Sequence, residues 1–538
     1  MKKEKVWKII VFLLLLFWLG FLYAQKIDLA TADLGRHIKN GEWVVENNFN
    51  LLEKKSPLRE NYYSYTNPDF PVINHHWGSG VVFYYIWKYA GFSGLSLLYI
   101  FLSLAAFLAF FWVACRESSF TWAALLAFAL APLMAERTEI RPEVFSVLFA
   151  AIFLLLLWRY SRGEIKWKWL LLLAPIQIVW VNFHVYFFLG FFLAGTFLFS
   201  EIVQIIFQKL TDEEFEKKLK KTKIMLVVLM LVLLASLINP FGLEGLLYPL
   251  KIFKNYGYTI VENKSVSFVE NYGVANPNFA LIKAVLALMV LSFVLLFIFN
   301  RKKISFFYLI FSLLFGILGW MAIRNFTLLG FFALPVLAYN FQAVFGQKKG
   351  EISIAKENGI AVLYIIVAVV GLWCNFEYVS FHSKRIGTGL LPRVTQAAEF
   401  FRKENIRGPV FNNYDIGGYL IFYLPKSEKV FVDNRPEAYP DCFFSEVYKP
   451  MQENADVFEN VDREYNFNAV VFYSHDITPW GVNFLKIIQE NPDWAKVHSD
   501  DYSVIYLKKN GENQPLIEKY PAVAGPRQGG GQIQDTKY

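Results

Sequence analysis

Long apolar runs recur along the first 373 residues, and they constrain the fold more than any other feature of this sequence. About eleven runs of roughly 13 to 25 residues approach or reach the length that one helix needs to cross the hydrocarbon core of a bilayer. They are Val6–Ala24, Gly91–Cys115, Phe120–Met134, Val144–Trp158, Trp169–Val181, Tyr186–Phe207, Ile224–Ile238, Phe279–Phe299, Phe306–Ile323, Phe326–Phe345 and Ile360–Trp373. Because backbone polar groups must be satisfied internally in lipid, we expect each run to be a helix. The sequence therefore predicts a polytopic α-helical membrane protein with about 11 transmembrane helices.

The composition supports this fold class. Hydrophobic residues make up 55% of the 538 residues and charged residues only 18%, which leaves too little polar surface to coat a soluble globule. The three cysteines, Cys115, Cys374 and Cys442, are too few and too scattered for a disulfide framework or a zinc knuckle.

Basic residues gather in alternate short loops and at the N-terminus. These basic segments are Lys2–Lys8, Arg116, Arg159–Lys168, Lys209–Lys223, Arg301–Lys303 and Lys348–Lys356. The positive-inside rule places them in the cytoplasm, so the formal charge of +8 reflects topology and we expect no nucleic-acid partner. None of these loops has the glycine-rich turn of a nucleotide site. We expect a multi-pass protein of the cell membrane (plasma or inner membrane) with a cytoplasmic N-terminus.

The chain changes character after Trp373, where helical and strand signals alternate as in a soluble domain. Helices are expected at Val394–Asn405 and Gly481–Gln489, and strands at Pro409–Phe411, Lys429–Asp433, Ala469–Tyr473 and Tyr502–Leu507. We therefore expect a transmembrane domain over residues 1–378, an extracytoplasmic α/β domain over 379–509 and a disordered tail over 510–538, where the sequence is polar and rich in Gly, Pro and Gln.

Ionisable residues are almost absent from the middles of the apolar runs, which disfavours ion-coupled transport. Charged residues, histidines and asparagines collect instead in five segments that the predicted topology places on the outer face of the membrane. Their main members are Asp28, Asp33, Arg36, His37, His75, His76, Glu136, Arg137, Glu139, Arg141, Glu143, Asn182, His184, Asn239, Glu262, Lys264, Arg324 and Asn325. Such a set on one membrane face suits a site for a polar headgroup at the lipid boundary.

The residue types in this set suit transfer of a sugar from a lipid phosphate. Asp33 could take the proton of an acceptor hydroxyl, and His37 lies close enough in sequence to be a second catalytic candidate. Charge-assisted hydrogen bonds could hold the donor phosphate, from Arg137, Arg141, His184 and Arg324. Further candidates for substrate contact are His75, His76, Glu139, Asn182 and Glu262. The partners would be a polyprenyl-phosphate sugar donor, membrane lipid and an extracytoplasmic acceptor, which could be a glycan, a lipid or a protein.

Each of these features also has a purely structural interpretation. Asp33 could be an ordinary carboxylate at a helix start, and Arg141 could be a helix-start residue that reaches the headgroups. His75 and His76 could bind a metal with Asp33 and His37, but adjacent histidines point in different directions in most backbones, so no metal ligand is assigned. Two other functions stay open, a lipid-linked glycan transporter or flippase and a non-catalytic membrane scaffold.

Several short motifs resemble, in order and over nearly the whole chain, the GT-C superfamily of bacterial membrane glycosyltransferases. They are Thr31-Ala32-Asp33-Leu34-Gly35-Arg36-His37-Ile38, Gly41-Glu42-Trp43, Ser64-Tyr65-Thr66, Asn74-His75-His76-Trp77, Arg141-Pro142-Glu143, Trp180-Val181-Asn182-Phe183-His184, Asn239-Pro240-Phe241-Gly242, Arg324-Asn325, Gly417-Gly418-Tyr419-Leu420 and Val432-Asp433-Asn434-Arg435. The chain is similar at a distance to protein O-mannosyltransferases and lipid A aminoarabinose transferases.

The resemblance implies a GT-C-like catalytic domain whose first outer loop carries the catalytic carboxylate, and Asp33 is the matching position. It implies an inverting transfer that is metal-independent or weakly metal-dependent. The chain departs from the pattern at Thr31 and His76, where relatives often carry an acidic residue. A divalent ion such as Mg²⁺ or Mn²⁺ therefore stays open as a cofactor.

Overall fold

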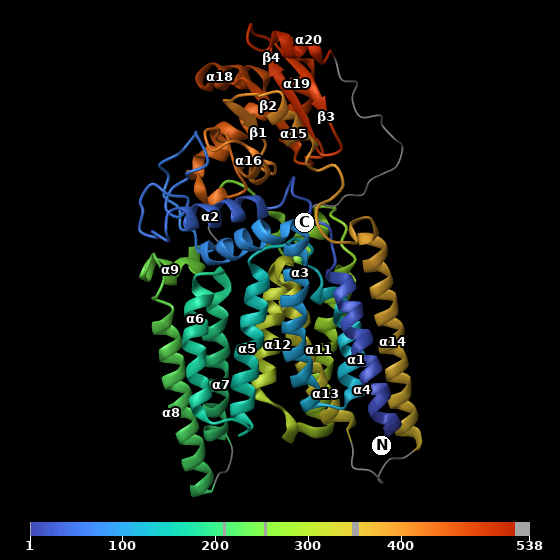
Figure 1. Cartoon of the computed structure of the whole chain (residues 1–538). Coiled ribbons are helices and arrows are strands. Elements are labelled where there is room, and N and C mark those ends of the chain that lie inside the picture. Colours follow the sequence, from blue (N-terminus) through green and yellow to red (C-terminus); the bar gives the residue numbers. More distant parts are fainter. Residues whose placement is uncertain (1, 208–210, 252–255, 347–353, 522–538) are drawn as a thin grey trace.

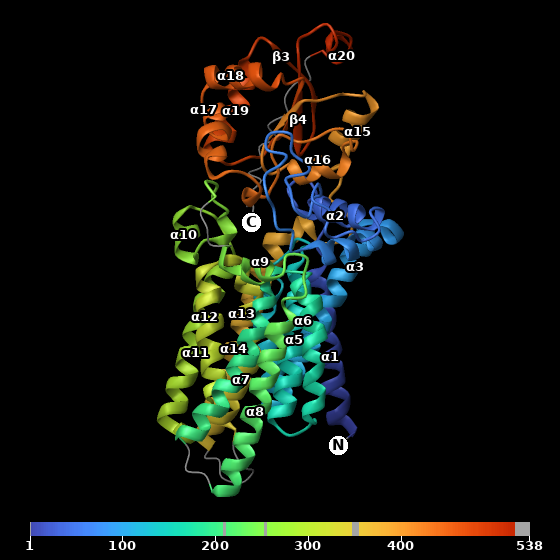
Figure 2. The same ribbon diagram turned by 90° about the vertical axis from the view of Figure 1, so that its left-hand side faces the viewer.

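The computed structural model describes the chain except for residues 1, 208–210, 252–255, 347–353 and 522–538. Long helices form a bundle, and a small α/β part lies at one end of it in both views (Figures 1 and 2). The bundle helices are α1 Lys2–Tyr23, α3 Trp77–Glu117, α4 Phe120–Met134, α5 Glu143–Ser161, α6 Leu173–Val181, α7 Phe188–Phe207, α8 Asp212–Ala235, α11 Asn278–Asn300, α12 Phe306–Met321, α13 Phe326–Phe345 and α14 Ile354–His382.

Every apolar run of the sequence overlaps one of these helices, which confirms the predicted helical bundle. Seven helical segments in the described ranges are long and apolar enough to cross a membrane, and three more, Phe120–Met134, Trp167–Val181 and Phe306–Met321, are apolar but shorter. The multi-pass character is therefore clear, while the number of about 11 crossings stays a prediction.

The basic loops meet at the end of the bundle that lies away from the α/β part. There Arg162 pairs with Glu117 at 2.7 Å, and the Tyr308 hydroxyl donates to the same carboxylate at 2.8 Å. The Lys221 ammonium group donates to the Ser161 carbonyl at 3.0 Å. Helix α1 also begins at this end (Figure 1). The bundle thus has one basic end and one end that carries the polar cluster described below.

The first outer loop contains helix α2, Leu34–Glu46, which packs against the beginning of α3. The helix axis of α3 breaks at Gly91, whose φ of +63° only glycine adopts easily. The backbones of α2 and α3 touch at Gly41 and Gly80, because a Cβ atom added to Gly41 would lie 2.0 Å from the Gly80 carbonyl oxygen. This close contact fixes the position of α2 on the bundle.

The second outer segment, which follows α8, consists of short helical pieces. They are α9 Leu243–Leu247, a 3-10 turn at Tyr248–Lys251, a second 3-10 turn at Val261–Asn263 and α10 Val266–Asn271. The turn at Val261–Asn263 places Glu262 beside the arginines of the neighbouring loops.

The C-terminal part contains a four-stranded sheet in the order β1-β2-β4-β3. Strand β1 (Val410–Asn412) is parallel to β2 (Ala469–Tyr473), and β4 (Ser503–Lys508) is antiparallel to both β2 and β3 (Trp494–Ser499). The accompanying helices are α15 Gln396–Lys403, α16 Gly417–Tyr423, α17 Pro450–Glu453, α18 Ala455–Tyr465, α19 Pro479–Glu490 and α20 Gln514–Lys519. Helix α16 packs on α2, since a Cβ on Gly35 would lie 2.6 Å from the Gly418 carbonyl oxygen.

The structure differs from the sequence-based expectation at several places in this part, where α16, α17 and α18 are additional to the expected helices. The strand expected at Lys429–Asp433 is reduced to isolated bridges from Val430 to Ser64 and Val410. Strand β3 was not expected. Within the tail expected to be disordered, α20 is held by Glu404, which accepts from Lys519 and Tyr520 at 2.7 and 2.8 Å. Residues 522–538 of that tail lie outside the described residues.

Candidate functional site

The charged turn between α4 and α5 forms the centre of a network of ion pairs at the end of the bundle nearest the α/β part. Arg137 pairs with Glu143 at 2.7 Å and with Glu262 at 2.9 Å. Arg141 pairs with Glu139 at 2.6 Å and with the other oxygen of Glu262 at 2.7 Å. Glu262 therefore bridges two arginines of the turn from the second outer segment.

Arg324, in the turn before α13, joins the same network. Its Nε donates to Glu143 at 3.1 Å, its Nη2 also pairs with that carboxylate, and its Nη1 donates to the Asn263 side-chain oxygen at 2.8 Å. Because Glu143 contacts both Arg137 and Arg324, the three arginines predicted to hold a phosphate are linked through shared carboxylates.

Asp33 lies at the edge of this network. It is the residue before α2, its side chain makes no capping hydrogen bond, and 20% of its side-chain surface is exposed. Its two oxygens lie 3.7 Å from Arg36 and 3.8 Å from Arg141. These ion-pair distances exceed those of direct hydrogen bonds, so the carboxylate oxygens can still accept a hydrogen bond from another group.

The hypothesis from the sequence requires Asp33 within about 15 Å of the phosphate-binding arginines, the span that one headgroup could bridge. The criterion applies to Arg141 and Arg324, and for Arg141 the separation is 3.8 Å. From Arg141, shared carboxylates continue through Glu262, Arg137 and Glu143 to Arg324. The structure thus brings together residues of four outer segments.

The four predicted histidines form a cluster centred on His76. The ring of His76 lies 3.8 Å from that of His75, 5.2 Å from that of His37 and 5.3 Å from that of His184, measured between centroids. Burial, reinforced by nearby arginines and histidines, lowers the pKa of all four, to about 3 for His75, so they are neutral at pH 7.

These histidines do not make a metal site in the observed arrangement. In the part of the chain that the structure describes, no three or more His, Cys, Asp or Glu side chains are grouped so as to hold an ion. The adjacent rings of His75 and His76 are tilted by 44° against each other, and guanidinium groups flank Asp33. The residues present therefore do not fit a bound divalent cation, and no step is assigned to one.

Glu139 and Glu262 differ in their electrostatic surroundings. Burial raises the pKa of Glu139, although Arg141 opposes this effect. Burial also favours the neutral form of Glu262, but Arg137 and Arg141 outweigh it and lower its pKa well below the usual value. Glu262 is thus a permanent anion between two guanidinium groups, in a position that another anion could take.

Asn182 has structural contacts at all its side-chain atoms. Its oxygen accepts from the Trp77 indole at 2.8 Å, and its nitrogen donates to the carbonyl groups of Ile178 and Ile238 at 2.8 and 2.9 Å. These bonds join the start of α3 to the ends of α6 and α8. The amide predicted to contact substrate is therefore already occupied by the protein.

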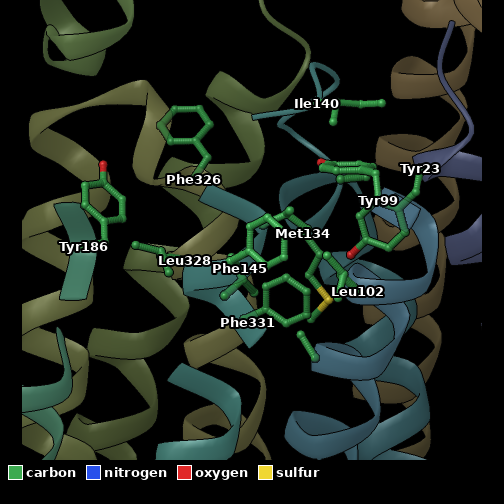
Figure 3. Close-up of a cluster of buried hydrophobic side chains, with 14 of the residues drawn as sticks. Tyr23, Tyr99, Leu102, Met134, Ile140, Phe145, Tyr186, Phe326, Leu328 and Phe331 are labelled. Atoms are coloured by element: carbon green, nitrogen blue, oxygen red, sulfur yellow. The ribbon is translucent and has the colours of Figure 1, made fainter. Parts of the chain in front are cut away.

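A pocket opens beneath the ion pairs, between α3, α5 and α13. Its polar wall consists of Arg137, Glu139, Arg141, Glu143 and Arg324, and its apolar wall includes Met134, Val144, Val147, Leu328 and Phe331. Figure 3 shows Met134, Leu328 and Phe331 in the apolar cluster below, with Tyr99 and Tyr186 on either side. A charged mouth above an apolar interior between membrane helices suits an amphiphile with an anionic head.

Four residues of the site were not among the predicted functional residues. Glu143 pairs with two arginines, the Tyr99 hydroxyl donates to the Arg137 carbonyl, and Ser146 contacts His184. Asn434, from the α/β part, accepts from Arg36 Nε at 3.4 Å. Glu143 directly follows Arg141-Pro142 and was the most recognisable of these in the sequence, whereas lone hydroxyl groups within apolar runs carry no local signal.

Solved structures share this fold. The oligosaccharyltransferase of Archaeoglobus fulgidus, solved with a tethered acceptor peptide, overlays with a TM-score of 0.63 at 12% sequence identity, covering 95% of this chain and 75% of that one. The same archaeal enzyme, AglB, in complex with an inhibitory peptide and a dolichol-phosphate overlays at 0.60 and 12% identity, covering 93% and 74%.

A third structure, ArnT from Cupriavidus metallidurans bound to undecaprenyl phosphate, covers 93% of this chain and 97% of its own at 12% identity. Its TM-score of 0.49 is too low to support an argument. No protein-family model and no curated protein sequence matches the chain. The overlay with the archaeal enzyme nevertheless spans both the bundle and the C-terminal part, so the chain has the fold of that oligosaccharyltransferase.

Proposed function

We propose that this protein is a membrane glycosyltransferase that moves a sugar from a polyprenyl-phosphate donor to a hydroxyl group of an extracytoplasmic glycan, lipid or protein. One observation carries the proposal: Asp33 lies 3.8 Å from Arg141, at the charged mouth of a pocket whose other wall is apolar. A base and cations for a phosphate meet there, above the apolar side chains of the bundle.

In this proposal Asp33 takes the proton of the acceptor hydroxyl as its oxygen bonds to the anomeric carbon of the sugar. The bond between that carbon and the phosphate oxygen breaks, and polyprenyl phosphate leaves. The transition state has oxocarbenium character, as in glycoside chemistry, and the transfer inverts the anomeric centre. Arg137, Arg141 and Arg324 stabilise the leaving phosphate by charge-assisted hydrogen bonds, which requires it to share or replace their present carboxylate partners.

The remaining candidates have places in this scheme. His37 lies one helical turn after Asp33, and its backbone amide donates to the Asp33 carbonyl at 3.1 Å. This hydrogen bond fixes the backbone of Asp33 at the start of α2. Glu139 and Glu262 hold Arg141 in place by ion pairs, and His75 and His76 pack against each other next to His37 and His184.

The proposed topology puts the N-terminus in the cytoplasm and the α/β part outside. The meeting of the basic loops at the end remote from the polar cluster supports this orientation. We also propose the domain division at about residue 378, close to the end of α14 at His382, with the α/β domain extending to residue 509. The archaeal enzyme with the same fold was solved in complex with a dolichol-phosphate, which supports the proposal that a lipid phosphate is part of the donor here.

Turnover of polyprenyl-phosphate sugars tests this function. Purified protein in nanodiscs is incubated with a panel of these donors, and release of free polyprenyl phosphate is measured for wild type, Asp33→Asn and the control Asp69→Asn. Asp69 is an exposed carboxylate of the same outer loop. Release by wild type and the control but not by Asp33→Asn supports the proposal. Binding without release in all three favours a transporter, and no binding favours a scaffold.

A further inference from the structure

A buried hydrogen-bond relay runs from α6 through α5 to His184. The Trp180 indole Nε1 donates to Ser146 Oγ at 2.8 Å, and Ser146 Oγ lies 2.8 Å from His184 Nδ1. Trp180 and Ser146 are fully buried, and His184 is 1% exposed. Water therefore cannot replace these contacts, and the three groups must satisfy one another.

The direction of each hydrogen bond follows from the chemistry of the groups. An indole N–H can only donate, so Ser146 Oγ accepts it and has its own proton left to donate to Nδ1. The backbone N–H of Tyr186 also points at Nδ1, at 3.4 Å. Two donors directed at one ring nitrogen require that nitrogen to carry a lone pair. In a neutral imidazole the single proton is then on Nε2.

His184 is neutral at physiological pH, because burial lowers its pKa well below the usual value. In the described parts of the chain, its Nε2 has no hydrogen-bond partner. The His184 ring lies beside the charged network. Its centroid is 4.7 Å from that of Tyr186, and the Arg324 guanidinium lies 5.7 Å from the Tyr186 ring on which it packs. The charges of Glu143 and Arg137 also act on His184. The ring that carries this unpaired N–H therefore packs on Tyr186, which lines the pocket of the arginines.

We propose that Ser146 is a positioning residue that, together with the Trp180 indole and the Tyr186 amide, holds His184 as the Nε2–H tautomer, so that His184 offers a neutral N–H donor to the donor phosphate. The phosphate part of this inference rests on the proposed function, whereas the tautomer does not. A neutral donor adds a directed hydrogen bond without adding positive charge, in contrast to the arginines. The donor also persists above pH 6.5, where a titrating histidine would lose its charge.

The tautomer is measured by NMR of protein labelled with [15N]histidine in nanodiscs. The 15N ring signals of His184 are assigned by their absence in His184→Gln. In wild type they should show an unprotonated Nδ1 and a protonated Nε2 from pH 6 to 8. Ser146→Ala should shift them toward a mixture of tautomers, Trp180→Phe should do so to a smaller extent, and Ser146→Thr should restore the wild-type pattern. An Nδ1–H tautomer or a charged imidazolium in wild type, or no change in Ser146→Ala, would overturn the proposal.

Binding of undecaprenyl phosphate and of undecaprenol, which lacks the phosphate, tests the second part. Ser146→Ala should weaken binding of the phosphate lipid about five-fold, the equivalent of one neutral hydrogen bond, and leave undecaprenol binding unchanged. His184→Gln should weaken binding of the phosphate lipid alone by about ten-fold. A matched control is Ser292→Ala, since Ser292 is also buried in a helix and accepts from Asn340 at 2.8 Å, but lies in the half of α11 that leads to the basic turn Arg301–Lys303.

Equal losses for both lipids in Ser146→Ala, or the same loss in the control, would show a structural effect and overturn the positioning role. If wild type binds neither lipid while the tautomer is as expected, the phosphate part is overturned and the tautomer part stands. The NMR result and the failure of the proposed function can thus be told apart.

Discussion

The contact between α2 and α3 leads to a quantitative prediction about Gly41. A Cβ atom there would lie 2.0 Å from the Gly80 carbonyl oxygen and 2.3 Å from the Gly80 carbonyl carbon. Ordinary contacts begin near 3.4 Å, so in Gly41→Ala the two helices must separate by about 1.4 Å. Both sides of the contact are backbone, so no side chain can rotate away to make room.

The expected effect is both structural and functional. Overpacking of this kind typically reduces the free energy of unfolding by about 1 to 3 kcal/mol. Helix α2 begins directly after Asp33, so the same shift moves the carboxylate relative to Arg141. A misplacement of about 1 Å at reacting groups can lower a rate about 100-fold. We therefore expect Gly41→Ala to lose turnover by a larger factor than its loss of stability explains.

Gly41→Ala is compared with the control Gly195→Ala in two measurements. The free energy of unfolding is measured in detergent micelles, and the turnover rate is measured in nanodiscs. Gly195 lies within α7 and has nothing within 4 Å of an added Cβ, so its substitution should leave both properties unchanged or add up to about 1 kcal/mol of stability. If Gly41→Ala matched Gly195→Ala in both measurements, the reasoning from backbone contact to site geometry would be refuted.

Three further outcomes are expected. Trp77→Phe should lower the free energy of unfolding by about 1 to 3 kcal/mol, because it leaves the buried Asn182 oxygen without its donor. The control Trp373→Phe, at an exposed position, should change the free energy of unfolding by less than about 0.5 kcal/mol. Burial raises the pKa of Glu136 to about 7 from 4.5, so the folded protein holds the extra proton and the free energy of unfolding falls as pH rises from about 4.5 to about 7. Glu136→Gln should flatten this profile by about 3 kcal/mol, which urea titrations at several pH values measure. EDTA should leave the thermal unfolding midpoint unchanged, since the described residues form no metal-holding group, and a clear downward shift would contradict that.

The helices of the bundle could be predicted because apolar length is a local property of the sequence. The gathering of polar residues on one face also followed from topology, since alternate loops share a side of the membrane. The sequence did not reveal which of these residues touch. Glu262, for example, lies more than 120 positions from Arg141 and meets it only because the second outer segment folds over the turn between α4 and α5.

The errors have physical causes. Strand β3, Trp494–Ser499, is an edge strand with only every third residue buried, so it lacks the apolar run or strict alternation that indicates a strand. Lys429–Asp433 has strand-forming residues but pairs only at Val430, because the first outer loop reaches it there. The amide of Asn182 was a reasonable substrate contact until the fold showed that Trp77 and two carbonyl groups occupy it.

A structure of the wild-type protein in nanodiscs with undecaprenyl phosphate tests the central claim most directly. The account predicts the phosphate at the mouth of the pocket, with its oxygens about 3 Å from guanidinium nitrogens of Arg137, Arg141 or Arg324, and the lipid chain along Leu328 and Phe331. A phosphate bound elsewhere, or no lipid bound at saturating concentration, would contradict it.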